Sequence, residues 1–178
     1  SSDLALLAKI TANKEEVNIG GAAVVKDYKL VGWLSEDETQ GVNFCLGKLK
    51  GGSLNLKDGR LAGNISFKIL SAKRRISLVD AGKTLSFVID IEIEGNIESA
   101  STGQKIDSDY VKIAGQVASE KAKAQATQAI NKLQKDYQVD LLNLSDYLYK
   151  YHPKVWKEDE GRWIELFPEV DIDVKVKS

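Results

Sequence analysis

Apolar and polar residues alternate along several stretches of the chain, the pattern of a strand with one buried face. The clearest case is residues 85–94, where Leu, Phe and Ile alternate with Ser, Asp and Glu apart from Val88. Further runs with this period cover residues 17–25, 30–34, 64–70 and 170–176. The alternating apolar residues occupy odd positions up to residue 69 and even positions from residue 76. This change predicts a bulge or break near residues 71–75. These patterns are typical of an antiparallel sheet covered on one side.

Other stretches space their apolar residues by three or four, which indicates amphipathic helices. Val42, Cys45, Leu46 and Leu49 form one such stripe. A longer stripe with alanine at its centre covers residues 107–138, and about 28 helical residues would extend about 42 Å. Shorter helices are expected over residues 141–151 and 156–163. The order of elements predicts an α+β fold: a mainly antiparallel sheet with one long and several shorter helices packed on one face.

The acidic string Ser35-Glu36-Asp37-Glu38 precedes the first helical stripe. Its spacing is that of a capping box, in which Ser35 accepts the backbone N–H of Glu38 and the Glu38 carboxylate accepts that of Ser35. Acidic residues in a first turn also suit the positive end of the helix dipole. We therefore interpret Ser35 and Glu38 as structural helix caps and not as parts of a reactive carboxylate cluster.

Composition excludes several classes of protein. The 178 residues carry 25 Lys and Arg against 26 Asp and Glu, with a sequence pI of about 5.9, so a nucleic-acid binder is not expected. No apolar run reaches the roughly 18–20 residues of a membrane-spanning helix. One cysteine excludes an internal disulfide.

We expect residues 1–15 to be an entering segment, linker or first strand, and residues 16–178 to form a single domain.

A search for reactive constellations leaves no catalytic, cofactor-binding or metal-binding residues to propose. A nucleophilic pair would require Cys45 and His152, yet Cys45 lies on an apolar stripe that favours a buried thiol. Asp171 and Asp173 alternate on the wet side of a strand, as solvated residues do. The string GVNFCLGK at residues 41–48 has five residues between its glycines, and a leucine where a phosphate-binding loop needs Ser or Thr.

Three residues remain as candidates for a partner interface. Arg74 and Arg75 belong to a basic run that either protects a solvated strand edge or contacts an acidic partner or phosphate head groups. Trp33 and Trp156 are expected to anchor the core, unless one of them lies at an interface, where tryptophan is enriched. Trp33, Arg74 and Arg75 are the interface candidates.

Several strings, in order, resemble the C-terminal domain of the spore germination lipoproteins, the GerAC-type C subunits of nutrient germinant receptors. The opening string GAAVVKDYKLVGWLSEDETQG carries most of the similarity, and Lys48 and Gly51-Gly52 follow it as in the family. The paired strings ISFKILSAKRRISL and FVIDIEIEGNI and the closing string YHPKVWKEDEGRWIELFPEVDIDVKVKS complete it. The similarity covers the chain from about residue 16 onward.

This resemblance implies a receptor subunit and not an enzyme. Family members act with A and B subunits that carry transmembrane segments, and a lipid on an N-terminal cysteine, absent from this chain, anchors them to the outer face of the inner spore membrane. The fragment itself is then expected to be soluble, to need no cofactor and to act through protein contacts. Two alternatives stay open: a small-molecule module that binds the germinant itself, and a hydrolase of cortex glycan with paired carboxylates.

Overall fold

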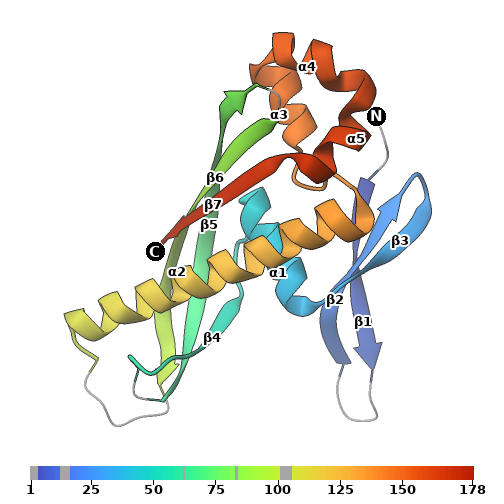
Figure 1. Cartoon of the computed structure of the whole chain (residues 1–178). Helices are drawn as coiled ribbons and strands as arrows, with labels where there is room; N and C mark the ends of the chain where they lie inside the picture. The colour runs from blue at the N-terminus through green and yellow to red at the C-terminus, as the bar shows by residue number, and fades with distance from the viewer. Residues whose placement is uncertain (1–3, 13–16, 62, 83, 101–105) are drawn as a thin grey trace.

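The computed structural model describes residues 4–12, 17–61, 63–82, 84–100 and 106–178 (Figure 1). Its strands are β1 (Leu4–Ala12), β2 (Val17–Lys26), β3 (Lys29–Leu34), β4 (Ser53–Lys57), β5 (Asn64–Ala81), β6 (Leu85–Ala100) and β7 (Asp171–Lys177). Its helices are α1 (Glu36–Leu46), α2 (Ser108–Asn131), the π-helical η1 (Lys132–Tyr137), α3 (Leu144–Tyr151), α4 (Pro153–Asp159) and α5 (Trp163–Leu166), with 3₁₀ turns η2 (Glu160–Arg162) and η3 (Phe167–Glu169).

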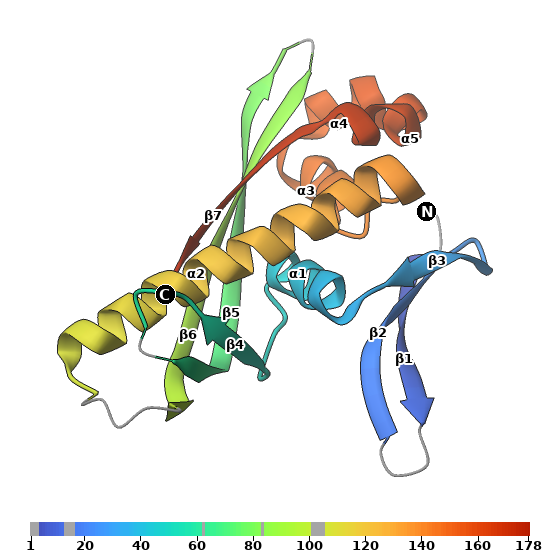
Figure 2. The same ribbon diagram turned by 60° about the horizontal axis from the view of Figure 1, so that its bottom comes forward.

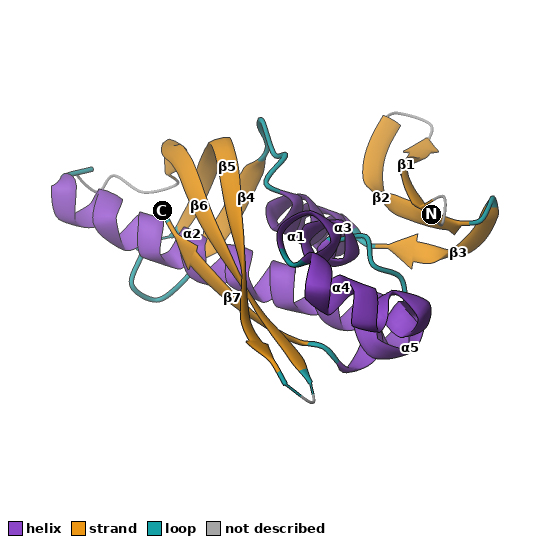
Figure 3. Cartoon of the chain, turned by 90° about the horizontal axis from the view of Figure 1, so that it is seen from above, coloured by secondary structure: helices purple, strands orange, loops and turns teal. Residues whose placement is uncertain are grey.

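The first three strands form an antiparallel sheet in the order β1-β2-β3. Figures 1 and 3 show this sheet on the far side of α1 from the second sheet. Between β2 and β3 the chain reverses through Asp27 and Tyr28, with φ of 49° and 62°. Positive φ at both central residues suits a tight turn whose twist matches that of the flanking strands. Strands β2 and β3 therefore form a hairpin.

The second sheet has the order β4-β5-β6-β7, with β7 parallel to β6 and the other neighbours antiparallel. Strand β5 is one continuous strand of 18 residues. A register shift between Ile69 and Ser71 accounts for the change in apolar parity, so the predicted irregularity is a bulge just before residue 71 and not a break. Strand β4 was not predicted from the sequence, because its five residues offer only Leu54 and Leu56 as alternating apolar positions.

Helix α2 crosses the covered face of the second sheet and continues toward α1 (Figure 2). Its buried stripe consists mainly of small side chains: Ala114, Ala118, Ala122, Ala126 and Ala129. Small side chains let helix backbones approach closely. At the crossing with α1, a Cβ added to Gly41 would lie 2.6 Å from the carbonyl carbon of Gln125 and 3.0 Å from the backbone nitrogen of Ala126. Glycine is therefore required at residue 41.

Two buried polar residues tie the C-terminal helices to the end of η1. The Gln134 side-chain amide donates to the carbonyls of Phe167 and Val170, both at 2.8 Å. The Asp140 carboxylate accepts the backbone N–H of Ser145 at 2.8 Å and the indole N–H of Trp163 at 3.2 Å. Burial raises the pKa of Asp140, while these donors act in the opposite direction. A buried carboxylate needs such donors, so the loop before α3 is fixed in place.

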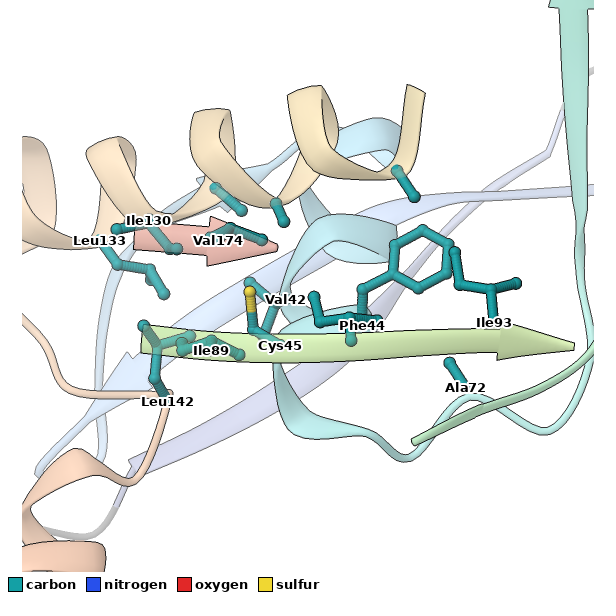
Figure 4. Packing of buried hydrophobic residues seen from close by; sticks show 14 of the residues in the cluster. Val42, Phe44, Cys45, Ala72, Ile89, Ile93, Ile130, Leu133, Leu142 and Val174 are labelled. Carbon is teal, nitrogen blue, oxygen red and sulfur yellow. The ribbon is translucent and has the colours of Figure 1, made fainter. Parts of the chain in front are cut away.

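One hydrophobic core joins the covered face of the second sheet to α1, α2 and the C-terminal helices. Figure 4 shows Val42, Phe44 and Cys45 of α1 packed beside Ile89 and Ile93 of β6, with Ile130 and Leu133 approaching from the helical side. The α+β class, the mainly antiparallel pairing and the one long helix are as predicted. The division of the strands between two sheets was not.

Candidate interaction site

The outward face of the three-stranded sheet is built from apolar side chains. Residues directly opposite each other on neighbouring antiparallel strands point to the same face. The register places Leu7, Ala23 and Trp33 in one row and Ala5, Val25 and Leu30 in the next. We call the face that carries these two rows the hairpin face.

Several side chains of the hairpin face are exposed to solvent. Leu7 and Leu30 are each 57% exposed and Trp33 is 46% exposed, while Ala23 is buried between its neighbours. Val31, the extra residue where the β2–β3 register shifts, is also exposed. The opposite face of the same sheet points inward, with Val24 and Leu34 in the core. Apolar residues thus occupy both faces, although burial within the chain explains only the inner one.

A tyrosine from η1 holds the outer edge of this sheet. The Tyr137 hydroxyl accepts the backbone N–H of Trp33 at 3.0 Å and donates to the carbonyl of the same residue at 2.6 Å. Both polar backbone groups of an edge residue are therefore satisfied by a side chain 104 positions away. We call this pair of hydrogen bonds the tyrosine latch. It fixes the hairpin face relative to the helices without using the Trp33 side chain.

Glycine and the π-helical turn make the tyrosine latch sterically feasible. A Cβ at Gly32 would lie 2.6 Å from the Tyr137 hydroxyl oxygen and closer still to its ring carbons. Tyr137 ends η1, and the next residue, Gln138, has a positive φ of 51°. A π-helical turn changes the direction of the following side chains relative to an α-helix, and such turns are frequent at functional sites. The sequence pattern places Tyr137 on a helical stripe but gives no signal for the latch.

The N-cap and acidic first turn of α1 stabilise the connection between this sheet and α2. Ser35 and Glu38 form the predicted capping box, with the Ser35 N–H donating to the Glu38 carboxylate at 2.7 Å. Lys132 approaches the same carboxylate at 3.2 Å, and Gln125 donates to Asp37 at 2.7 Å. Burial acts to raise the pKa of Glu38, but the Ser35 N–H and Lys132 together hold it below its usual value. The carboxylates at residues 37 and 38 thus have structural partners.

The two arginine candidates have different surroundings. Arg74 points inward, where its guanidinium donates to the carbonyls of Cys45 and Leu142, both at 2.7 Å. Arg75 is exposed and lies opposite Asp90 of β6 in the register. Neither residue lies on the hairpin face. Of the three interface candidates from the sequence, Trp33 alone lies there, and its half-exposed side chain departs from the expectation that it anchors the core.

The described residues offer little reactive chemistry. Cys45 is fully buried, and burial raises the pKa of its thiol to about 12, although Arg74 lowers it somewhat. His152 lies 3.1 Å from the Tyr147 hydroxyl, in an aromatic cluster. Among the described residues no cluster of three His, Cys, Asp or Glu side chains could hold a metal ion, and no helix is long and apolar enough to cross a membrane.

Comparison with known proteins identifies relatives over almost the whole chain. The chain is 30% identical over 174 residues to the spore germination protein YndF of Bacillus subtilis (strain 168). This alignment covers 96% of the present chain and 43% of YndF. The chain is 29% identical over 171 residues to the spore germination protein B3 of the same organism, covering 93% and 45%. The chain thus spans about half the length of these relatives.

A solved structure agrees with these relatives. The crystal structure of the GerBC protein superposes with a TM-score of 0.84 at 28% identity, covering 99% of this chain and 56% of the other. The two chains therefore share the same fold. The family described as "Spore germination B3/ GerAC like, C-terminal" matches residues 20–178. The chain therefore belongs to this family of spore germination proteins.

Proposed function

We propose that the chain is a non-catalytic contact domain of a nutrient germinant receptor, with residues 16–178 forming its C-terminal domain. The observation that carries this proposal is the hairpin face, an exposed apolar surface on a sheet that the tyrosine latch holds in place. Exposed apolar patches of this kind mark interaction sites, and tryptophan is enriched among the residues that contribute most to binding.

The proposed occupant of the hairpin face is another receptor subunit, of the A or B type. An apolar centre with a charged rim is the common anatomy of such contacts, and Lys26 and Lys29 flank the turn beside Leu30. The competing occupant is the rest of the same polypeptide, because the relatives are about twice as long as this chain. An N-terminal lipid anchor outside this chain would hold the protein at the outer face of the inner spore membrane.

A small-molecule module is the second candidate. The observation that favours it is a groove of about 600 Å³ beside α3, lined by Arg75, Asp146, Lys150 and Tyr147 among others. A volume of this size lies in the range of ligand pockets. Calorimetric titration of the 178-residue chain with candidate germinants would give a saturable heat if the domain bound them itself.

Deletion of the domain tests the proposed role in the receptor. The full-length protein would be replaced in spores by one that lacks these 178 residues, with its accumulation checked by immunoblot. The fall in optical density after addition of nutrient would then be followed. We expect loss of the nutrient response and intact germination with a receptor-independent chemical. A normal nutrient response would refute the proposal.

A further inference from the structure

Strand β5 has an edge that is only partly occupied. Strand β4 pairs with β5 over residues 64–68 alone, whereas β6 pairs with it as far as Ala81. Beyond β4, the backbone N–H of Ile69 and that of Ala72 donate to loop carbonyls, at 2.9 and 3.0 Å. Past Ala72, no described strand or loop pairs with this edge. Every second residue of a strand points its backbone N–H and C=O to the same edge. The N–H and C=O groups of Ile76 and Leu78 therefore point to the same edge as those of Ala72.

Helix α3 stands opposite this edge and makes it one side of a groove. The groove has a volume of about 600 Å³ and is lined by Arg75 and Ile76 of β5 and by Asn143, Asp146, Tyr147 and Lys150 on the helical side. Its wall is held in place, because the Tyr147 ring packs edge-on against Phe87 at 6.3 Å and its hydroxyl lies 3.1 Å from His152. An added strand would lie about 4.8 Å from β5, between it and α3.

The charge of the groove favours an acidic occupant. Arg74, Arg75 and Lys150 line it together with the single carboxylate of Asp146, which leaves a formal excess of two positive charges. Within the described part of the chain, none of these three cations forms an ion pair. Arg74 is committed to two backbone carbonyls, so Arg75 and Lys150 are the cations available to a partner.

We propose that this groove binds an extended acidic segment of a partner protein, which adds as a strand to the free edge of β5. Proteins usually block an exposed strand edge, and an edge facing a preformed groove is the arrangement that peptide-binding domains use for strand addition. A free amino acid or sugar would leave the repeated backbone groups of Ile76 and Leu78 unused. The inference goes beyond the proposed function, since it concerns a surface separate from the hairpin face.

Selection from a random octapeptide library displayed on phage tests the inference with the 178-residue chain. We expect enrichment of acidic peptides in which acidic residues recur at every second position, as in a strand. Fluorescence anisotropy should show that they bind with micromolar affinity. Arg75→Glu and Lys150→Glu should each weaken the binding about tenfold or more, because a charge contact is replaced by repulsion. Lys123→Glu carries the same charge change on the exposed side of α2, away from the groove, and should alter the affinity less than about twofold.

Two further measurements separate strand addition from other modes of binding. A selected peptide methylated on alternate backbone nitrogens keeps its charge but cannot pair with β5, so it should lose at least about tenfold in affinity. Failure to enrich acidic peptides, equal binding of the methylated peptide, or no response to Lys150→Glu would overturn the inference. Displacement of the peptide by millimolar free glutamate would also overturn it, in favour of a small-molecule site. A Trp33→Ser chain should bind the peptide normally, so this test is independent of the hairpin face.

Discussion

The close crossing of α1 and α2 allows the substitution of glycine by alanine to be tested at two positions. We expect it to lower the stability of the chain at one glycine and to raise it at the other. Gly41 lies inside α1 against the backbone of Gln125 and Ala126, whereas Gly115 lies inside α2, where an added Cβ would meet Ser178 at ordinary contact distance, 3.5 Å. In both helices alanine gains about 1 kcal/mol in helix propensity over glycine. Only at residue 41 does the new methyl group collide with helix backbone that cannot rotate away.

The expected magnitudes follow from these two contributions. Overpacking costs about 1–3 kcal/mol, and the backbone contact at residue 41 puts Gly41→Ala at or beyond the upper end of that range. After the propensity gain, we expect a net loss of about 2 kcal/mol for Gly41→Ala and a gain of about 0.5–1 kcal/mol for Gly115→Ala. With a urea m-value of about 2 kcal/mol/M, the midpoint should fall by about 1 M in the first variant and rise by about 0.3–0.5 M in the second.

Urea unfolding followed by far-ultraviolet circular dichroism and tryptophan fluorescence measures both variants. Coincidence of the two probes checks that the transition is two-state, so that the free energies can be compared. An unchanged or higher midpoint for Gly41→Ala would refute the helix crossing described above. A lower midpoint for Gly115→Ala would refute the conclusion that a methyl group at residue 115 makes only an ordinary contact with Ser178.

Three further predictions concern the latch, the thiol and the helix cap. Tyr137→Phe should lower the free energy of unfolding by about 1–2 kcal/mol, because the backbone N–H and C=O of Trp33 lose their hydrogen-bond partner. Tyr149→Phe changes an exposed side chain and should leave that free energy unchanged. Equal urea midpoints for the two variants would contradict the tyrosine latch. Cys45 should react with a disulfide reagent at least about 1,000-fold more slowly in the folded than in the urea-unfolded chain, and fast labelling would contradict its burial. The pKa of Glu38 is lower in the folded chain than its usual 4.5, so its contribution to stability is complete above pH 4.5 and is lost as the pH falls through the folded pKa. Glu38→Gln should therefore flatten the loss of unfolding free energy between pH 7 and pH 3, and superimposable profiles would argue against this role.

Features determined by local patterns could be predicted from the sequence. The alternation over residues 85–94 fixes β6, and the four-residue string from Ser35 to Glu38 fixes the start of α1, because a capping box needs only neighbouring atoms. The ordered strings that resemble the spore germination family also lie in contiguous segments. These features can be recognised in the sequence because each depends on residues close together in the chain.

Features determined by distant contacts could not be predicted in this way. Tyr137 and Trp33 are 104 residues apart, and a tyrosine on a helical stripe looks like any core aromatic residue. The exposure of Trp33 depends on which face of the first sheet meets α1, and alternation alone does not show this for a strand with apolar residues on both faces. The parallel pairing of β7 with β6 likewise requires knowledge of how the last helices return the chain to the sheet.

The most direct test of the central claim is nutrient germination of spores whose full-length protein carries changes on the hairpin face. Leu30→Ser and Trp33→Ser remove exposed apolar side chains and leave the backbone of the tyrosine latch in place. Ile164→Ser removes a similarly exposed apolar side chain from α5 and serves as the control. At equal protein levels on an immunoblot, we predict slower or absent nutrient germination for the two hairpin-face variants and a normal response for the control. Normal germination of both hairpin-face variants would contradict the claim that this face contacts another receptor subunit.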